Sequence, residues 1–412
     1  VYLADATNVT EVVVSDSRKA MAHAAARFYD NPSEAFQLVG VTGTNGKTTT
    51  TYLVEHIARV AGKRTGVIGT VGTRIGDASE KSEHTTPESP DLQRTFARMR
   101  EAGCDVVAME VSSHALDLVR TWGTRFAVTA FTNLTQDHLD YHHTFDAYFE
   151  AKALLFSGDY PARRVISIND KWGVELLRRC TAAGDAVITC GFDASAQIHP
   201  VEVSYDGSSN YTAGNVQALA DVPSVPGRLE RVKAACDGGV SVYVDYAHTP
   251  DALTKAISSV KALSKRRTLV VFGCGGNRDA SKRPIMGRAA LEADYAVVTS
   301  DNPRHERPEA IIEDIVAGMG EPSGRYEVVC DRRCAIERAV ELARPGDCVL
   351  VAGKGHEDYQ LVGDEVLSFD DRVVAREALE RIKGASGEGE AGASHSAGCG
   401  GSADASAKDG ER

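Results

Sequence analysis

The chain has 412 residues and a formal net charge of −12 at pH 7, with 42% hydrophobic residues. This length predicts about two or three domains, each able to bury its own core, and the acidic balance argues against a nucleic-acid-binding protein, whose binding surface is usually basic. The nine cysteines include no Cys-x-x-Cys pair and no apolar run approaches the ~18 residues that a membrane span needs, so we expect a cytoplasmic protein without membrane insertion. We also expect a monomer that binds no nucleic acid.

Strand-like and helix-like segments alternate along most of the chain. The apolar run 36–41 leads into a glycine-rich turn, and a helix is expected from Thr48 to about Ala61. Further strands are expected at residues 66–69, 106–111, 127–131, 165–168, 186–189, 242–246, 269–272, 296–299, 326–329 and 348–351. Helical periodicity is found at residues 251–263, 283–293, 308–317, 332–343 and 371–382. Apolar strands that alternate with helices predict an α/β fold whose parallel sheets are covered on both faces.

A segment with two prolines and a glycine, residues 223–227, is the best internal domain boundary. We therefore expect a P-loop central domain with a parallel-rich sheet at residues 36–223 and a C-terminal Rossmann-like α/β domain at residues 224–384. From about Gly384 the composition changes to Gly, Ser, Ala and acidic residues without periodicity. This composition predicts a disordered tail at residues 385–412.

The turn Gly43-Thr44-Asn45-Gly46-Lys47-Thr48-Thr49 is the strongest functional signal of the chain. A buried strand, a glycine turn and a helix start bring several backbone N–H groups and the positive end of a helix to one point, which suits phosphate. Lys47 is expected to reach the terminal phosphates of a nucleotide, and the Thr48 hydroxyl suits Mg²⁺. The first glycine of the general motif would fall at position 41, which is valine here. The alternative is a purely structural turn.

Other short motifs follow this turn in a definite order. They are His84–Pro87, Glu110–His114, Thr132–Leu134, Asp137–Asp140, Glu150–Lys152, Pro226–Glu230, Asp245–Pro250, Asp301–Arg304 and Gly353–Glu357. In this order, over residues 36–384, the motifs resemble those of the Mur ligases of bacterial cell-wall synthesis, in particular the type that adds diaminopimelate. The resemblance implies an ATP- and Mg²⁺-dependent ligase of peptidoglycan precursor synthesis. Such an enzyme joins meso-diaminopimelate to UDP-N-acetylmuramoyl-L-alanyl-D-glutamate through an acyl phosphate.

An ATP-dependent amide ligase has to bring two anions together, the γ-phosphate and a carboxylate, so cations must offset their repulsion. Thr48 and Glu110 offer hard oxygen donors of the kind that bind Mg²⁺. The resemblance places His138 and Lys152 at a second Mg²⁺. In the relatives this lysine is carbamylated by CO₂, which requires the neutral amine. Lys47, Glu110, His138 and Lys152 are therefore the expected catalytic residues.

The residues by themselves also have structural interpretations, which would be favoured without the resemblance. Lys152 is typical of an ordinary lysine on a helix surface, and Glu110 of a solvated strand end. Ser112 could cap the next helix. His142 and His143 are expected on the surface.

The resemblance also assigns ligand contacts in both domains. Expected ATP contacts are residues 43–49, Arg228 and Asp245; expected contacts of the nucleotide-linked dipeptide are Ser17, Thr85, Thr86, Ser112 and Arg120; expected diaminopimelate contacts are Arg278, Asp301, Asn302, Pro303, Arg304, Gly353 and Glu357. Because Arg228 and Asp245 lie beyond the domain boundary, the C-terminal domain would have to close over the central one. Such closure would exclude water from the acyl phosphate.

The segment Asp301–Arg304 is expected to select the incoming amino acid. Diaminopimelate differs from lysine by a second carboxylate, which Arg304 can bind bidentately with help from Arg278. Glu357 is expected to face the substrate's ammonium group. The alternative is that Asp-Asn-Pro-Arg only forms a turn that ends a strand.

Three departures from the family pattern stand out. Residues 1–35 are expected to be a remnant of the UDP-binding N-terminal domain, and Leu118 replaces a common glutamine. The central domain is shortened near residues 209–222, where the Phe-Asn-Val-Tyr-Asn motif of the family cannot be recovered. Two alternatives therefore stay open, a folylpolyglutamate-synthetase-like ligase and a catalytically impaired Mur-like nucleotide-binding scaffold. The Asp-Asn-Pro-Arg and Gly-Lys-Gly-His-Glu segments speak against the first.

Overall fold

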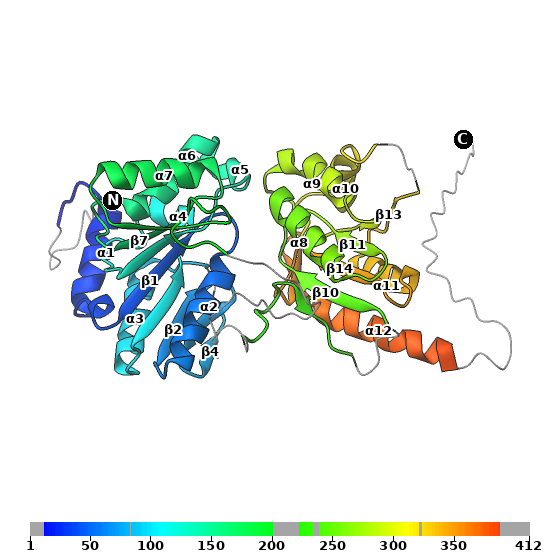
Figure 1. The fold of residues 1–412 in the computed structure, drawn as a ribbon, viewed down its shortest axis with the longest axis horizontal. Coiled ribbons are helices and arrows are strands. Elements are labelled where there is room, and N and C mark those ends of the chain that lie inside the picture. Colours follow the sequence, from blue (N-terminus) through cyan, green and yellow to red (C-terminus); the bar gives the residue numbers. More distant parts are fainter. Residues whose placement is uncertain (1–11, 83, 201–221, 235–238, 321–323, 388–412) are drawn as a thin grey trace, which may run out of the picture.

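The computed structural model describes residues 12–82, 84–200, 222–234, 239–320 and 324–387. Two large sheets, one in each half of the chain, organise the fold (Figure 1). The first has eight strands in the order β4-β3-β2-β5-β1-β6-β7-β8, and the second has six in the order β13-β12-β11-β14-β10-β9. The expected α/β class with parallel-rich sheets is confirmed.

The first sheet is parallel except at one edge. Its parallel strands are β1 (Gln37–Thr42), β2 (Thr65–Gly69), β5 (Val106–Glu110), β6 (Val128–Phe131), β7 (Arg163–Ser167) and β8 (Val187–Cys190), and its antiparallel edge is β3 (Gly72–Ile75) and β4 (Ala78–Glu80). Its helices are α1 (Ser17–Phe28), α2 (Lys47–Val60), α3 (Ser89–Glu101), α4 (Ser113–Asp117), α5 (Leu139–His142), α6 (Phe145–Ala153) and α7 (Lys171–Ala182), with 3-10 turns η1 (Pro32–Glu34) and η2 (Leu154–Phe156).

The second sheet is parallel apart from the short edge strand β9 (Glu230–Arg231). Its other strands are β10 (Ser241–Asp245), β11 (Thr268–Phe272), β12 (Tyr295–Val298), β13 (Tyr326–Val328) and β14 (Cys348–Ala352). The hairpin of β15 (Tyr359–Val362) and β16 (Glu365–Ser368) forms a separate two-stranded sheet. The helices of this half are α8 (Pro250–Leu263), α9 (Arg283–Ala290), α10 (Pro308–Val316), α11 (Arg332–Leu342) and α12 (Asp371–Gly387), with the 3-10 turn η4 (Ala280–Lys282). Each expected strand or helix overlaps an observed one, with ends that differ by a few residues.

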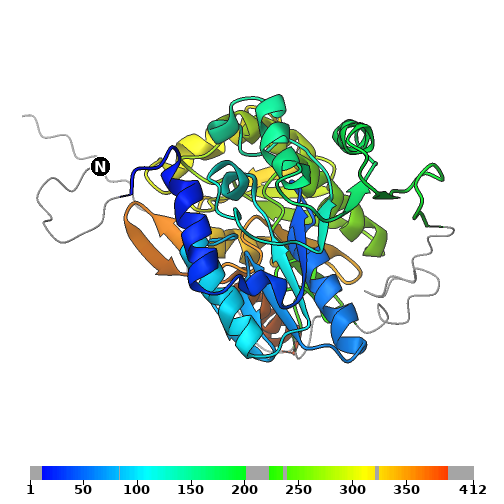
Figure 2. The ribbon, with the colours of Figure 1, turned by 90° about the vertical axis from the view of Figure 1, so that its left-hand side faces the viewer.

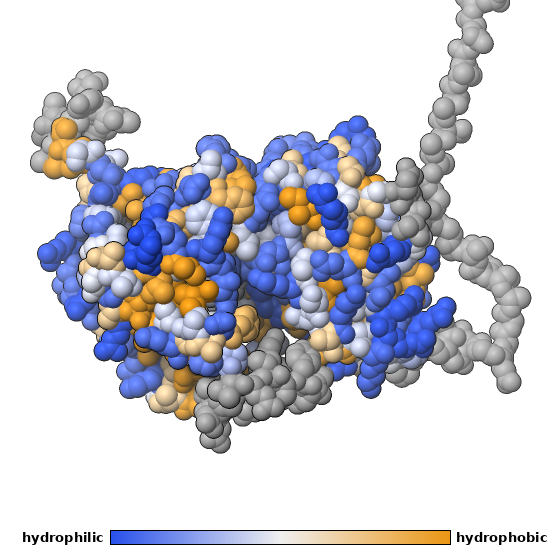
Figure 3. All heavy atoms as spheres, turned by 45° about the horizontal axis from the view of Figure 1, so that its top comes forward, coloured by the Kyte–Doolittle hydropathy of each residue, from blue (hydrophilic) through white to orange (hydrophobic). Residues whose placement is uncertain are grey.

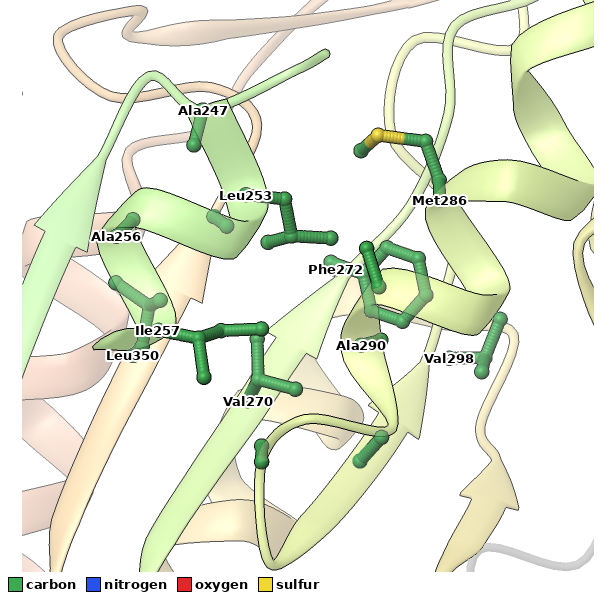
Figure 4. Packing of buried hydrophobic residues seen from close by; sticks show 14 of the residues in the cluster. Ala247, Leu253, Ala256, Ile257, Val270, Phe272, Met286, Ala290, Val298 and Leu350 are labelled. Atoms are coloured by element: carbon green, nitrogen blue, oxygen red, sulfur yellow. The ribbon is translucent and has the colours of Figure 1, made fainter. Parts of the chain in front are cut away.

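The apolar strands of the second sheet are buried on both faces. Val270 and Phe272 of β11 pack with residues of α8 and α9 (Figure 4) and belong to the same buried cluster as residues of α10, whereas Leu269 and Val271 pack with residues of α11 and α12. Successive side chains of a strand point to opposite faces, so helices on both sides require apolar residues at every position. This double burial explains why the strands of this sheet have no polar alternation.

Replacing Leu350 of β14 by alanine is expected to destabilise this half by about 2–5 kcal/mol, because its fully buried side chain would leave a cavity in a close-packed core. The free energy of unfolding would be measured by urea titration of the full chain. Leu367→Ala is the control, since Leu367 of β16 is exposed and should change the free energy by less than about 0.5 kcal/mol. Equal unfolding midpoints for both variants would contradict this account of the core.

Two regions bear on the expected domain limits. The helix α12 continues to Gly387, so residues 385–387 are helical and not part of a disordered tail as predicted. Glycine is common where helices end but does not forbid a helix, and α12 continues past Gly384 and ends at Gly387. The rest of the predicted tail, and all but Val222 of the shortened segment 209–222, lie outside the described residues.

The helix α1 packs beside α3, one of the helices of the first sheet. Figures 1 and 2 show α1 beside α3, and η1 also contacts α3. Trp122 Nε1 donates a hydrogen bond of 2.7 Å to His23 Nε2 of α1. No helix within the described ranges is long and apolar enough to cross a membrane.

Candidate active site

The phosphate-binding turn joins β1 to α2 in the expected geometry. Gly46, which precedes α2, has a φ of 86°, and a Cβ on Gly43 would lie 1.9 Å from Thr132 Oγ1. Both positions therefore require glycine. Val41 lies inside β1 and is fully buried, so the turn begins later than in the general motif.

Two lysine side chains meet at this turn. Lys47 Nζ donates hydrogen bonds of 2.9 Å to the carbonyl oxygens of Gly43 and Thr44, and Lys152 Nζ donates one of 2.9 Å to Gly43 O. Burial, with a smaller contribution from Lys47, holds the pKa of Lys152 well below its usual value. The neutral amine that carbamylation needs is therefore favoured at this position.

Lys152 is 1% exposed, so its interpretation as a helix-surface lysine is wrong. It follows Tyr148 by one helical turn on α6, and its Nζ lies 4.5 Å from the centre of that ring. The Tyr148 hydroxyl lies 3.2 Å from Thr44 Oγ1. The helix α6 thus presents the face with Tyr148 and Lys152 to the phosphate-binding turn. The nine residues of this helix are too few for their pattern of apolar and polar residues to show which face is buried.

Glu110 ends β5 directly beside this turn. The parallel register sets it opposite Val41 of β1, and its Oε1 accepts hydrogen bonds of 2.9 Å from Thr48 Oγ1 and from the backbone N–H of Thr70. It is buried, so the interpretation as a solvated strand end is wrong. A Cβ on Gly69 would lie 2.3 Å from Glu110 Oε1, which explains the glycine there.

His138 directly precedes α5. Burial lowers the pKa of His138 to about 3, which leaves the imidazole neutral and able to bind a metal. Its ring centre is 6.1 Å from that of Tyr148, the ring that Lys152 also contacts. His142 was expected on the surface, but it is buried, with its Nε2 2.9 Å from Ser113 Oγ. His143 is exposed as expected.

The oxygens of Thr48 and Glu110 fit Mg²⁺ that is held mainly by nucleotide phosphates, because Mg²⁺ commonly takes only one or two protein ligands. A closed protein site is not present in the described part of the chain, where no three His, Cys, Asp or Glu side chains gather in a way that could hold a metal. The pair His138 and Lys152 would become a second pair of ligands only after the amine acquires a carboxylate.

The two halves of the chain meet at the phosphate-binding turn. Arg228 Nη2 donates a hydrogen bond of 2.9 Å to Thr48 Oγ1, and Asn45 Nδ2 donates one of 2.9 Å to Asp251 Oδ2. His356 Nε2 lies 3.3 Å from Thr70 O. The surface is hollowed between the two halves (Figure 3).

Asp137 and Asp245 support this junction. Asp137 Oδ2 lies 3.5 Å from His248 Nε2, and its Oδ1 lies 3.6 Å from Lys282 Nζ. Burial alone would raise the pKa of Asp137, but its histidine and lysine neighbours hold it well below the usual value. Both oxygens of Asp245 accept backbone hydrogen bonds, including one of 2.7 Å from Leu229, so this residue orders the turn that carries Arg228.

The residues expected to contact the nucleotide-linked dipeptide lie next to Glu110, with one exception. Thr86 Oγ1 donates a hydrogen bond of 2.8 Å to Glu110 O and accepts one of 3.1 Å from the backbone N–H of Ser112. Arg120 Nη1 donates a hydrogen bond of 3.0 Å to Thr86 O. The Ser112 hydroxyl accepts from Ala115 N, so Ser112 does cap α4.

The other two predicted dipeptide contacts differ in their placement. Thr85 Oγ1 lies 3.1 Å from Thr70 Oγ1, which in turn donates to Glu110 Oε2. Ser17 is exposed at the start of α1. The adjacent Arg18 connects this end of α1 to Leu118 O at 3.2 Å.

The residues expected to contact diaminopimelate gather where β11, β12 and β14 end. Asn302 Nδ2 donates 2.9 Å to Glu357 Oε2, and Arg304 Nη1 donates 3.0 Å to Gly276 O. A Cβ on Gly353 would lie 2.4 Å from Asp301 Oδ2. The expected set is thus brought together, and the segment is more than a strand-ending turn.

Arg304 and Arg278 approach each other at this end of the sheet. A Cβ on Gly275 would lie 3.0 Å from Arg304 Nη1 and 3.8 Å from Arg278 Cγ. Burial, and then the neighbouring Arg278, lower the pKa of Arg304. Pro303 O closes the same turn, since a Cβ on Gly276 would lie 1.9 Å from it. The charge of Arg278 is thus near enough to lower the pKa of Arg304, and two neighbouring cations suit a carboxylate ligand.

Comparison with known proteins agrees with this geometry. The Mur ligase middle domain matches residues 41–227, and the Mur ligase, glutamate ligase domain matches residues 227–355. The UDP-N-acetylmuramoyl-L-alanyl-D-glutamate–2,6-diaminopimelate ligase of Geobacillus thermodenitrificans is 44% identical over 90% of this chain and 85% of its own length. The protein of the same name from Gloeobacter violaceus is 44% identical over 90% of this chain and 83% of its own length.

Solved structures give the same picture. One of a UDP-N-acetylmuramoyl-L-alanyl-D-glutamate–2,6-diaminopimelate ligase aligns with a TM-score of 0.59 and 31% identity, over 90% of this chain and 84% of the other. A folylpolyglutamate synthase of Mycobacterium tuberculosis aligns with a TM-score of 0.64 at 18% identity, over 89% and 95%, which shows a shared fold alone. With two matching domains and relatives of this identity, the chain belongs to the Mur ligase family.

Proposed function

We propose that this chain is an ATP- and Mg²⁺-dependent ligase that joins meso-diaminopimelate to the D-glutamate of UDP-N-acetylmuramoyl-L-alanyl-D-glutamate. The observation that carries the proposal is the position of Thr70 between two sites. Its N–H donates to Glu110 beside the phosphate-binding turn, and its carbonyl lies 3.3 Å from His356, the neighbour of Glu357 in the expected amino-acid site. Relatives that are 44% identical bear the name of this activity.

The first step is transfer of the γ-phosphoryl group to the carboxylate of D-glutamate, which forms an acyl phosphate and releases ADP. The N–H groups at the start of α2 and the Lys47 ammonium would hold the phosphates. Arg228 adds a positive charge from the other half of the chain, so the repulsion between the two anions is offset from both sides. Mg²⁺ on Thr48 and Glu110, and on His138 with carbamylated Lys152, would supply further positive charge.

In the second step the amine of diaminopimelate attacks the acyl carbon and phosphate leaves. Arg304 and Arg278 would bind the carboxylate that lysine lacks, and Glu357 would accept the substrate's ammonium. The contacts of Arg228 and Asn45 with the opposite half keep the two sites joined and help to exclude water from the acyl phosphate.

The division into a central domain at residues 36–223 and a C-terminal domain at residues 224–384 belongs to the proposal. Its support is that each sheet has a separate buried core. A cytoplasmic location and a monomeric state are also proposed. The location is supported by the cysteines of the described ranges, which form no disulfide with one another, as expected in a reducing compartment.

The test is phosphate release from ATP with Mg²⁺, the nucleotide-linked dipeptide and one amino acid. Release with diaminopimelate but not with lysine or glutamate is the expected result. Release with lysine would overturn the role of Arg304, and release with a folate substrate and glutamate would favour the folylpolyglutamate-synthetase-like alternative. Tight ATP binding without any release would identify a non-catalytic scaffold.

A further inference from the structure

Lys354 has a fully buried ammonium group within the expected amino-acid site. Its Nζ donates hydrogen bonds of 3.0 Å to Asn302 Oδ1 and 3.3 Å to Glu357 Oε2, and it lies 5.5 Å from the centre of the Tyr359 ring. The side chain is 0% exposed, so it cannot reach a ligand in the hollow between the two halves. A buried lysine is stable only when its charge is compensated, which assigns it to Glu357 and Asn302.

The two oxygens of Glu357 have different surroundings. Oε2 accepts from both Lys354 Nζ and Asn302 Nδ2, at 3.3 and 2.9 Å. Oε1 accepts no hydrogen bond from any residue that the structure describes. The carboxylate is therefore held by one oxygen and presents the other, and 15% of the side chain is exposed.

The side chain of Asn302 is also fixed by the hairpin β15–β16. Its Oδ1 accepts 2.9 Å from the backbone N–H of Leu361 in β15 as well as the bond from Lys354. Gln360 Nε2 donates a hydrogen bond of 2.6 Å to Asp301 O, and the backbone N–H of Arg304 donates one of 3.0 Å to Leu361 O. The hairpin β15–β16 thus fixes the backbone of the segment that carries Arg304, while Lys354 fixes the side chains of Asn302 and Glu357.

We propose that Lys354 is a positioning residue of the amino-acid site, which holds Glu357 ionised and oriented so that Oε1 receives the ammonium group of the incoming diaminopimelate. This inference rests on the proposed function. Burial and the neighbouring Asp301 raise the pKa of Glu357, and Lys354, the cation in direct contact with it, acts in the opposite direction. Without it, the carboxylate would take up a proton or turn, and the ammonium would lose its acceptor.

The test compares steady-state and single-turnover kinetics of the full chain with Lys354→Met, which keeps the length of the side chain and removes its charge. The KM for diaminopimelate should rise about 10- to 100-fold, as expected for losing a charged hydrogen bond to the substrate. The KM values for ATP and for the nucleotide-linked dipeptide should stay within about twofold. ADP formation in a single turnover without amino acid should also be unchanged, because the acyl phosphate forms before the amine is used.

A double-mutant cycle separates positioning from general structural damage. In a Glu357→Gln background, adding Lys354→Met should change the KM for diaminopimelate by less than about threefold, because the charge on which Lys354 acts is already gone. Lys265→Met, at an exposed lysine, is the matched control and should behave as the wild type. Should Lys354→Met fail to fold, Lys354→Gln carries the same comparison.

Three outcomes would overturn the inference. An unchanged KM for diaminopimelate in Lys354→Met, with wild-type activity present, would show that Glu357 does not need this lysine. Equal losses in the single-turnover step and in every KM would indicate a structural role only. A wild-type chain that forms the acyl phosphate but never uses diaminopimelate would contradict the proposed function itself, and the inference with it.

Discussion

Replacing Lys152 by alanine is expected to lower kcat by at least about 10³-fold, and added bicarbonate should not restore it. In the proposed mechanism this side chain, once carbamylated, helps to hold positive charge where two anions react, and such electrostatic groups each contribute about 10²- to 10³-fold or more. The variant also loses the contact with Gly43 O at the phosphate-binding turn. The measurement is phosphate release with saturating substrates, in buffer depleted of CO₂ and then supplemented with bicarbonate.

The wild type should respond to bicarbonate in this assay and Lys152→Ala should not. Lys63→Ala is the control, because Lys63 is exposed. The alanine variant should fold, since the depressed pKa of Lys152 means that the unfolded chain binds a proton more readily, and removing such a group relieves a cost at neutral pH. Near-normal turnover in the folded variant would rule out the carbamate.

Replacing Arg304 by alanine is expected to lower kcat/KM for diaminopimelate by about 10²- to 10⁴-fold, as two charged hydrogen bonds to a carboxylate are lost. Arg304 has a φ of 53°, in the left-handed region that alanine also disfavours, so the backbone strain of the two proteins is similar. Kinetics with diaminopimelate and with lysine as competing amines would measure the change in selectivity.

Arg304→Lys should fall between the wild type and the alanine variant, because it keeps the charge and loses the planar fork. Arg307→Lys is the matched control at an exposed arginine three residues further along the chain. A selectivity for diaminopimelate over lysine that survives in Arg304→Ala would move recognition of the second carboxylate to Arg278 or elsewhere.

The phosphate-binding turn shows what could be predicted from sequence. A strand, a glycine turn and a helix start are contiguous, so their chemistry depends on neighbouring residues, and even the departure from the general motif at Val41 is visible in the sequence. The apolar strands were equally clear. The order of the strands in the sheet could not be predicted from their sequences. In the structure β5 lies between β1 and β2, which sets Glu110 opposite Val41.

The buried charges show the limit. Lys152 and Lys354 are both buried, although the residues around Lys152, without the family resemblance, are typical of a helix surface, and no role was predicted for Lys354 within its motif. Their partners, Gly43 for one and Asn302 for the other, come from distant parts of the chain. Periodicity on a short helix or in a turn carries no information about such partners.

By itself, then, the order of residues determined the α/β class, the phosphate-binding turn and, through resemblance, the set of residues that belongs to a Mur ligase. Local propensities and turn chemistry depend on residues close in sequence, so they are legible there. The tertiary structure alone decided which polar groups lose water and which face each other, as with Glu110 beside Thr48 or Lys354 beside Glu357. Desolvation depends on atoms supplied by other elements, and it is desolvation that turns these ordinary side chains into a site.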